Sequence, residues 1–165
     1  MEKEESHNNI TVYYGLGKGK THAALGRGVV AAGQGLRVNI IQFFKSKKDF
    51  NIDYFSRLEP ELKYFRFQKS EGSFDSLDDE QKKEECVNMQ NGLSFAKKVM
   101  TTRGCDVLIL DEFLGLVESG LISPQEVETL FACKPPSMQL IITGQVLNEV
   151  VRRAAGEVYN ITPDK

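Results

Sequence analysis

A glycine-rich segment that ends in a lysine and a threonine is the part of this chain best suited to bind phosphate. It reads Gly15-Leu16-Gly17-Lys18-Gly19-Lys20-Thr21 and follows a strand-like run, Ile10–Tyr14. Glycines leave backbone N–H groups free to turn toward an anion, and a helix that begins near Lys20 points its positive end at the same place. The Lys20 ammonium suits phosphate oxygens, and the Thr21 hydroxyl suits Mg²⁺. The segment therefore predicts a phosphate-binding loop.

This loop is one residue shorter than the pattern common in nucleotide hydrolases. The pattern G-x-x-x-x-G-K-[ST] would place its first glycine at position 14, where this chain has Tyr14. A glycine-rich turn that merely connects a strand to a helix is the alternative interpretation. The register of Lys20 and Thr21 directly after a strand favours phosphate binding.

Two adjacent carboxylates, Asp111 and Glu112, follow the apolar run Val107-Leu108-Ile109-Leu110. An apolar run without alternation is typical of a central strand that is covered on both faces. Carboxylate oxygens suit Mg²⁺, which also keeps several waters and bridges phosphate oxygens. An acidic pair after a strand can also simply begin a helix. In combination with the loop, the pair predicts a Mg²⁺ site with Thr21, Asp111 and Glu112 as ligands.

The elements that must position these residues alternate between strand and helix. Strand patterns occupy residues 10–14, 37–43, 62–67, 106–110, 139–143 and, more weakly, 157–161, and helix patterns lie between them. Such alternation, with no long linker, predicts one parallel sheet with helices on both faces. With the phosphate loop after the first strand, we expect the α/β fold of a RecA-like P-loop NTPase.

Two of the expected helices have distinct ends. The first spans residues 20–32 and is expected to stop at Gly33. Gly26 and Gly28 inside it each cost about 1 kcal/mol relative to alanine, which close packing against the sheet or a neighbour would explain. Another helix begins at Ser123, where Glu126 completes a capping box, and a proline lies at its first position. Its inner face should comprise Val127, Leu130 and Phe131.

The longest expected helix spans residues 78–102, with Ser76 and Asp79 as its cap. Spacings of three and four residues place Cys86, Met89, Leu93, Ala96 and Met100 on one buried face. Residues 45–51 and 69–79 are polar and are expected to form loops at the carboxyl edge of the sheet. Ligands of parallel α/β folds bind at that edge.

The charge balance bears on the class of partner. The chain has 165 residues, with 21 basic and 23 acidic side chains and a formal net charge of −2. A general nucleic-acid binder would show a basic field, so we expect no nucleic-acid partner. Two local basic clusters, Lys45/Lys47/Lys48 and Arg152/Arg153, are interpreted as solvated faces.

Cysteine usage and hydropathy bear on the cellular compartment. The three cysteines are far apart and form no C-x-x-C pair, which indicates free thiols in a reducing cytoplasm. No apolar run reaches the roughly 18 residues of a membrane-spanning helix, so we expect no membrane association. Residues 1–5 are charged and lack the apolar centre of a signal peptide. We expect a disordered lead-in over residues 1–9 and a single nucleotide-binding domain over residues 10–165.

From about residue 10 to its last residue the chain resembles the P-loop ATP:corrinoid adenosyltransferases. The short family loop G-x-G-K-G-K-T-T-A-A is similar to residues 15–24, with His22 in place of the second threonine. The family strand end Q-F-x-K resembles residues 42–45, and V-x-L-D-E resembles residues 108–112. The L-P-x-E-E-V and I-I-T-G segments resemble residues 122–127 and 141–144.

The resemblance implies transfer of the 5′-deoxyadenosyl group of ATP to the Co(I) centre of a reduced corrinoid, with release of triphosphate. Since Co(I) is itself the nucleophile, the protein positions the substrates and stabilises the leaving triphosphate through Lys20 and Mg²⁺. By resemblance the metal ligands are Thr21, Glu112 and Asp111. The nucleotide contacts are Gly15, Leu16, Gly17, Lys18, Gly19, Lys20, Thr21, His22 and Arg27. The resemblance also implies an electron-donating flavoprotein partner and a homodimer.

The family loop on the corrinoid side carries aromatic residues that displace the lower ligand of cobalt and so make reduction to Co(I) feasible. This chain has no tryptophan, and the corresponding segment reads Glu71-Gly72-Ser73-Phe74-Asp75. Phe74 is the candidate for the apolar wedge, because an exposed aromatic side chain in a polar loop usually has something to bind. Phe65 and Phe67 either support it or belong to the core beside the sheet.

Two other classes of function fit the phosphate loop. A different P-loop ATPase or kinase would use the same loop and carboxylates on the γ-phosphate, and Arg103, Arg152 or Arg153 would then act across a subunit interface. A diverged relative without catalysis would bind ATP or a corrinoid and signal to a partner. Incubation with MgATP and a reduced corrinoid separates the three hypotheses.

Overall fold

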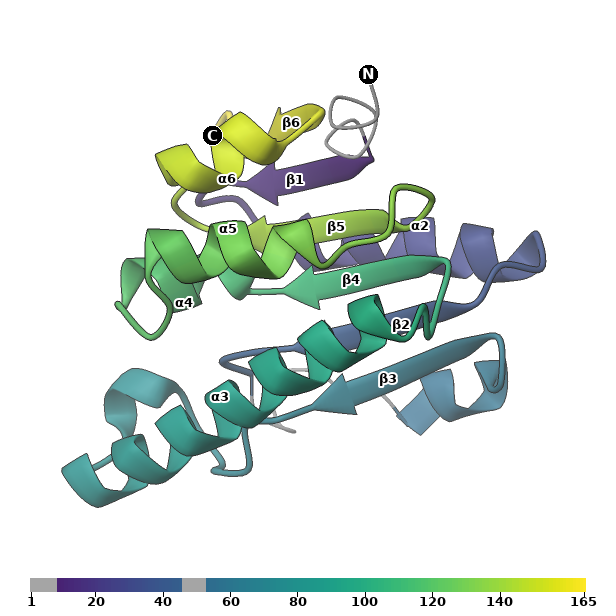
Figure 1. Cartoon of the computed structure of the whole chain (residues 1–165). Helices are drawn as coiled ribbons and strands as arrows, with labels where there is room; N and C mark the ends of the chain where they lie inside the picture. Colours follow the sequence, from purple (N-terminus) through teal and green to yellow (C-terminus); the bar gives the residue numbers. More distant parts are fainter. Residues whose placement is uncertain (1–8, 46–52) are drawn as a thin grey trace.

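The computed structural model describes residues 9–45 and 53–165, which are arranged around a six-stranded sheet in the order β3-β2-β4-β5-β1-β6. Every neighbouring pair of strands is parallel, and Figure 1 shows all the arrows pointing the same way. The strands are β1 (Ile10–Tyr14), β2 (Val38–Gln42), β3 (Leu62–Arg66), β4 (Val107–Asp111), β5 (Gln139–Gly144) and β6 (Glu157–Asn160). The predicted parallel sheet is therefore confirmed, with some strand bounds shifted.

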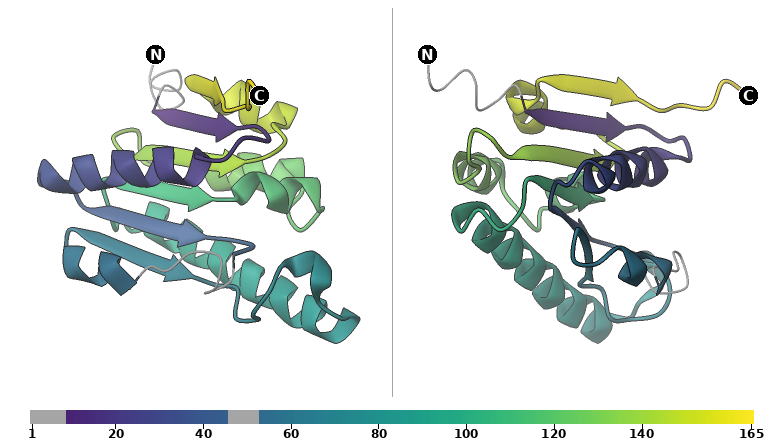
Figure 2. Two further views of the ribbon diagram at one scale, coloured as in Figure 1. Left: turned by 180° about the vertical axis from the view of Figure 1, so that it is seen from behind. Right: turned by 90° about the vertical axis from the view of Figure 1, so that its right-hand side faces the viewer.

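Helices cover both faces of this sheet, as expected. On one face lie α2 (Lys20–Gly33) and the 3₁₀ helix η1 (Asp53–Leu58). On the other lie α3 (Asp79–Thr101), α4 (Phe113–Glu118) and α5 (Pro124–Ala132), with α6 (Glu149–Ala154) next to α5. The edge-on view in Figure 2 separates these two layers, with the sheet between them.

Alternate residues of the central strands pack into two apolar cores, one on each face of the sheet. In β4, Leu108 and Leu110 pack with α3, α4 and α5, whereas Val107 and Ile109 pack with α2. Successive side chains of a strand point to opposite faces, so a run without polar alternation serves both cores. This burial fixes Asp111, the last residue of β4, at the carboxyl edge of the sheet.

The glycines of α2 divide into two kinds. A Cβ at Gly28 would lie 2.9 Å from Ile109 Cδ1 and 3.3 Å from Val38 Cγ1, so close packing against the sheet explains this glycine. Nothing lies within 4 Å of a Cβ at Gly26, and the packing explanation is wrong there. The helix α2 ends at Gly33, as expected, but Gly33 is its last residue, and Gly35 is the glycine that adopts the left-handed conformation after the helix.

The cap of α3 differs from the prediction. Asp78, and not Ser76, is the N-cap, and it forms a capping box with Gln81. The Asp78 carboxylate accepts from an N–H of the first turn, which Ser76 cannot do because it belongs to the 3₁₀ helix η2 (Phe74–Ser76). The capping box of α5, from Ser123 and Glu126, is confirmed, and so is its buried face. Of the five residues expected on the inner face of α3, four are buried, and Cys86 is partly exposed.

Several expectations concern segments outside the described residues. The disordered lead-in falls mostly on residues 1–8, and the loop expected at 45–51 is described only at Lys45. Residues 69–79 form an irregular segment that includes η2. None of the helices in the described part of the chain combines the length and apolar composition needed to cross a bilayer. In Figure 1, η2 and the first turns of α3 extend past the carboxyl ends of the strands.

Candidate functional site

The glycine-rich loop connects β1 to α2 and packs against the segment that follows β6. Gly15 and Gly19 have φ values of 125° and 105°, a region that glycine adopts easily. A Cβ would lie 2.4 Å from Ile161 O at Gly15 and 2.6 Å from the same oxygen at Gly17, so no larger residue fits at either position. The Gly17 N–H donates to Ile161 O at 2.8 Å, and the Gly15 N–H donates to Gly144 O at 3.2 Å. These two N–H groups therefore shape the loop.

Other N–H groups of the loop are available to a ligand. Among the described residues, the N–H groups of Gly19, Lys20 and Thr21 donate to no backbone carbonyl. They lie at the start of α2, a helix of 14 residues whose cap residue, Gly19, provides no side-chain acceptor. Unpaired N–H groups and the positive end of the helix dipole together favour an anion.

Lys20 reaches across this loop. Its Nζ donates to Gly17 O at 2.7 Å, and the residue is only 8 % exposed. The hydrogen bond holds the ammonium beside the N–H groups of the same loop. A phosphate bound there would meet a charged donor in addition to the backbone donors.

The Asp111 carboxylate is the centre of a buried hydrogen-bond cluster. Its Oδ1 accepts from Thr21 Oγ1 at 2.9 Å and from Thr143 Oγ1 at 2.6 Å. Its Oδ2 accepts from Gln42 Nε2 at 2.7 Å and from Lys45 Nζ at 3.2 Å. The partners come from α2, β5 and the end of β2, so this one side chain joins elements that are far apart in sequence. The side chain is 1 % exposed, and four hydrogen bonds, one of them from an ammonium group, compensate its burial.

Glu112 lies next to this cluster in a left-handed conformation, with φ of 61°. Its N–H donates to Thr143 Oγ1 at 2.8 Å, and its Oε1 lies 3.8 Å from Lys45 Nζ. Burial raises the pKa of Glu112, and the negative charge of Asp111 raises it further. The structure thus brings Thr21, Asp111 and Glu112 together, as the sequence predicted.

A cation fits among these oxygens. Lys45 Nζ contacts Thr21 Oγ1 and lies 3.2 Å from Asp111 Oδ2 and 3.8 Å from Glu112 Oε1, so an ammonium group already stands between them. Within residues 9–45 and 53–165, no group of three or more His, Cys, Asp and Glu side chains is arranged to hold a metal by itself. A hydroxyl with one or two carboxylates suits Mg²⁺ when phosphate oxygens and waters complete its shell.

Three side chains of this cluster were not among the predicted site residues: Gln42, Lys45 and Thr143. The interpretation of Lys45 as part of a solvated cluster is wrong, because only 22 % of its side chain is exposed and it pairs with Asp111. Lys47 and Lys48 lie outside the described residues. The signal was present in the Q-F-x-K and I-I-T-G segments, whose polar residues end β2 and β5. Arg152 and Arg153 are exposed, as expected.

Two side chains of β3 hold the side-chain oxygen of Gln42. Tyr64 donates its hydroxyl hydrogen to Gln42 Oε1, and Arg66 donates to the same oxygen at 3.4 Å. Burial raises the pKa of Tyr64, so its hydroxyl keeps the proton that it donates. With its oxygen fixed in this way, Gln42 presents its amide N–H group to Asp111.

Phe74 contacts Phe44, which lies just after the end of β2. Its ring packs edge-on against Phe44, with 5.4 Å between the centroids, and Lys82 Nζ lies 6.0 Å from the Phe74 centroid. Phe44 has φ of 55°, and its ring lies 3.1 Å from where a Cβ at Gly115 would be. Phe44 immediately precedes Lys45, so the aromatic contact holds the chain next to the lysine of the cluster.

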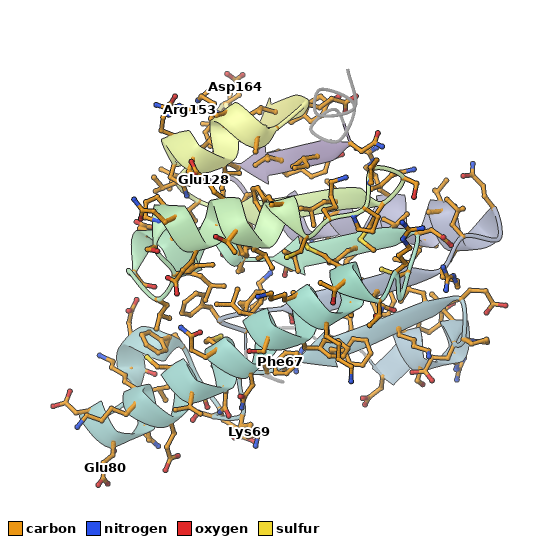
Figure 3. The ribbon with its side chains drawn as sticks, viewed as in Figure 1. Phe67, Lys69, Glu80, Glu128, Arg153 and Asp164 are labelled. Atoms are coloured by element: carbon orange, nitrogen blue, oxygen red, sulfur yellow. The ribbon has the colours of Figure 1, made fainter. Side chains whose placement is uncertain are left out.

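The segment before Phe74 is tied to α3. The Glu85 carboxylate, in a residue 1 % exposed, accepts from the N–H of Lys69 at 3.1 Å and of Ser70 at 2.7 Å. Burial raises the pKa of Glu85, but hydrogen bonds from Ser70, Asn88 and Lys69 outweigh it, and the net pKa lies below the ordinary range. In Figure 3, Phe67 lies between β3 and α3, and Lys69 and Glu80 mark the part that extends past the sheet.

Phe65 and Phe67 belong to the core, as one of the two interpretations had it. Both pack on Phe95 of α3, with centroid separations of 4.7 Å and 5.9 Å. A Cβ at Gly92 would lie 2.7 Å from Phe43 and 3.1 Å from Phe67, so α3 approaches the sheet closely here.

The remaining predicted nucleotide contacts lie on the loop and along α2. Arg27 donates to Thr11 Oγ1 at 3.2 Å and lies 3.9 Å from a carboxylate oxygen of Glu157, so it sits over β1 and β6. Leu16, Lys18 and His22 are exposed on the loop and the first turn of α2. The structure does not bring Arg27 to the carboxylate cluster.

Comparison with known proteins gives a family match across nearly the whole chain. The model of the family described as ATP:corrinoid adenosyltransferase BtuR/CobO/CobP matches residues 6–165. The corrinoid adenosyltransferase of Escherichia coli (strain K12) is 26% identical over 167 residues, which cover 99% of this chain and 81% of the relative. Corrinoid adenosyltransferase CobA of Salmonella typhimurium is 27% identical over 168 residues, with the same coverage of both chains.

Among solved structures, the chain is similar to a KaiC-like protein, PH0186, from Pyrococcus horikoshii OT3. The TM-score is 0.62 at 14% sequence identity, and the match covers 94% of this chain and 73% of that protein. At this identity the similarity concerns the fold alone. It confirms the expected RecA-like P-loop architecture.

Proposed function

The chain belongs to the ATP:corrinoid adenosyltransferase family BtuR/CobO/CobP, and on that premise we propose that it transfers the 5′-deoxyadenosyl group of ATP to the Co(I) centre of a corrinoid. In this reaction a cobalt–carbon bond forms at the 5′-carbon while the bond from that carbon to the triphosphate oxygen breaks. Both electrons of the broken bond leave with triphosphate, and cobalt passes formally from Co(I) to Co(III). The family match favours this function over a phosphate-transferring ATPase and over a binding protein without catalysis.

The observation that carries the proposal is the junction of the phosphate loop with the carboxylate cluster through Thr21. Its hydroxyl donates to Asp111 at 2.9 Å, while its N–H belongs to the start of α2. We propose that the N–H groups of Gly19, Lys20 and Thr21 and the Lys20 ammonium bind the triphosphate. These donors stabilise the charge that grows on the leaving group, which is the main task of the protein in such a displacement.

We propose that Thr21, Asp111 and Glu112 hold Mg²⁺. When bound, the ion supplies positive charge to the triphosphate oxygens. Asp111 is held in place by its hydroxyl and amide donors, and Thr143 also holds the backbone of Glu112. The protein thereby fixes the Asp111 carboxylate and the backbone of Glu112 before substrate arrives, so that little reorganisation is needed.

On the corrinoid side we propose Phe74 as the apolar wedge. Phe44 supports its ring, and Glu85 holds the preceding segment to α3. A wedge that displaces the lower ligand makes Co(II) easier to reduce, and it has no part in the attack by Co(I). The position of Phe74 beside the end of β2 supports this assignment.

By analogy with the family we also propose a homodimer and an electron-donating flavoprotein as partners. We propose a cytoplasmic location, because the cysteines, Cys86, Cys105 and Cys133, are all free thiols. Burial raises the pKa of the Cys105 thiol to about 12, so this side chain is inert packing in the core.

The test is an anaerobic assay with MgATP and a chemically reduced corrinoid, in which the adenosylated product is followed by its absorption spectrum. We expect turnover by the wild type and a loss of about a hundredfold or more for Lys20→Ala, because a charged donor to the leaving group is removed. Lys63→Ala, at the start of β3 and outside the site, serves as the control and should keep its activity. A Lys20→Ala protein with unchanged turnover would remove the loop from the mechanism.

A further inference from the structure

The Lys45 ammonium occupies the centre of the cluster that is expected to hold the divalent cation. Its Nζ contacts Thr21 Oγ1, lies 3.2 Å from Asp111 Oδ2 and lies 3.8 Å from Glu112 Oε1. We infer that Lys45 and the divalent cation compete for these oxygens, and that the displaced ammonium becomes a second lysine for the triphosphate. The inference rests on the proposed function and assigns Lys45 a role beyond it.

The pairing of β2 with β4 and a turn at Phe44 determine the position of Lys45. The Phe43 N–H donates to Asp111 O at 3.0 Å, which continues the pairing of β2 with β4. The chain then turns sharply at Phe44, a residue with φ of 55°, whose ring is packed against Phe74 and close to Gly115. Because a left-handed conformation is unfavourable for a residue with a bulky side chain, packing must stabilise this turn. The turn directs Lys45 back over the end of β4.

The Asp111 carboxylate has no free acceptor position for a second cation. Thr21 Oγ1 donates its hydrogen to Asp111, so only its lone pairs can bind a cation. One of these lone pairs accepts from Lys45 Nζ. Asp111 Oδ1 already accepts from two hydroxyl groups, and Oδ2 accepts from Gln42 and Lys45. A metal ion that binds Thr21 Oγ1 and Asp111 therefore has to displace the ammonium, which it also repels.

Charge balance indicates where the displaced ammonium goes. The cluster contains two carboxylates, Asp111 and Glu112, and one ammonium, from Lys45. A divalent cation neutralises both carboxylates and leaves the positive charge of Lys45 without a counter-charge. The nearest place for an anion is the start of α2, since Thr21 belongs both to the cluster and to that helix terminus. Lysine is a point charge on a flexible stem, and it can follow an anion over a short distance.

Metal binding in this arrangement releases a lysine for the triphosphate. The loop then offers two lysines of different origin: Lys20, held on Gly17 O, and Lys45, released from the cluster. Lys45 would touch the substrate only when the cation is bound. Binding of metal and of triphosphate would therefore reinforce each other.

Lys45→Met tests this role, because methionine keeps an unbranched side chain and removes the charge. The first measurement is Mn²⁺ binding in the absence of nucleotide, followed by electron paramagnetic resonance of the free ion. We expect Mn²⁺ to bind at least about tenfold more tightly to Lys45→Met than to the wild type, because the competing ammonium is gone. Unchanged or weaker Mn²⁺ binding would overturn the competition.

The second measurement is triphosphate binding by calorimetry at saturating Mn²⁺, where we expect Lys45→Met to bind at least about tenfold more weakly. Triphosphate affinity equal to that of the wild type would restrict Lys45 to neutralising the cluster and would overturn the second part of the inference. Lys63→Met, on β3, is the matched control for the loss of one positive charge and should change neither affinity.

These readouts are independent of the corrinoid reaction. If Lys45→Met shows both changes in affinity but the wild type never adenosylates a corrinoid, the proposed function fails and the role of Lys45 stands. If adenosylation proceeds and Lys45→Met shows neither change in affinity, the proposed function stands and the role of Lys45 is refuted.

Discussion

Replacement of Thr143 by valine tests the hydrogen-bond cluster that positions both carboxylates. Thr143 is fully buried at the end of β5, and valine has nearly the same shape. The change removes the donor 2.6 Å from Asp111 Oδ1 and the acceptor 2.8 Å from the Glu112 N–H. A hydrogen bond to a charged group contributes about 1.5–3 kcal/mol, and a buried N–H left without an acceptor costs about 1–3 kcal/mol.

Asp111 Oδ1 keeps Thr21 as a donor, so part of the first contribution is retained. We therefore expect Thr143→Val to lower the free energy of unfolding by about 2–4 kcal/mol. Thr143→Ser keeps the hydroxyl group and loses one buried methyl group, which should cost only about 1 kcal/mol.

Urea unfolding followed by far-ultraviolet circular dichroism suits the measurement, because the chain contains no tryptophan for fluorescence. A Thr143→Val protein as stable as the wild type, or more stable than Thr143→Ser, would refute the assignment of both hydrogen bonds. The same variant should also bind MgATP more weakly, since Asp111 and Glu112 lose a shared anchor.

Three further predictions concern the aromatic wedge, the segment that carries it and α2. Phe74→Ala should slow adenosylation that starts from Co(II) and leave the reaction of chemically reduced Co(I) unchanged. A variant that is as fast as the wild type from Co(II) would show that Phe74 is not the wedge. Glu85→Gln should destabilise the protein near neutral pH, because the lowered pKa of Glu85 contributes stability that is fully present above the ordinary value of 4.5. This contribution is lost as the pH falls from 4.5 through the lowered pKa, so the difference from the wild type should shrink in acid. Urea unfolding across this pH range checks the sign, and a difference that grows in acid would contradict it. Gly26→Ala should stabilise the protein by about 1 kcal/mol, because nothing lies near its Cβ. Gly28→Val should destabilise it by about 1–3 kcal/mol, because the added atoms would meet Ile109 and Val38; thermal unfolding of the pair compares them directly, and equal midpoints would contradict both.

The sheet could be predicted from the sequence because local patterns determine most of it. The apolar run of β4 and the capping box of α5 each reflect physics that acts over a few residues. The helices α4 and α6 have six residues each, too few for a helical period to be recognised. In the structure α4 packs on β5 and α6 packs on α5, contacts between elements that no local pattern reports, although Asn148 caps the start of α6 locally.

The site was predictable where its residues act through a short motif. Lys20 and Thr21 could be found from their spacing to the glycines, and Asp111 from its place after an apolar strand. Lys45 was misinterpreted because, in sequence, it belongs to a run of lysines that is typical of a solvated surface. Its partner Asp111 is 66 residues away, and only the pairing of β2 with β4 brings the two together. The anchoring of Phe74 through Glu85 likewise depends on the path of α3.

The identity of the products tests the central claim most directly. We would incubate the protein with MgATP and a Co(I) corrinoid under anaerobic conditions and quantify the products by phosphorus NMR and visible absorption. We expect an adenosylated corrinoid and intact triphosphate in equal amounts, both dependent on Lys20. Orthophosphate released at the same rate without any corrinoid, and no adenosylated product, would contradict that claim.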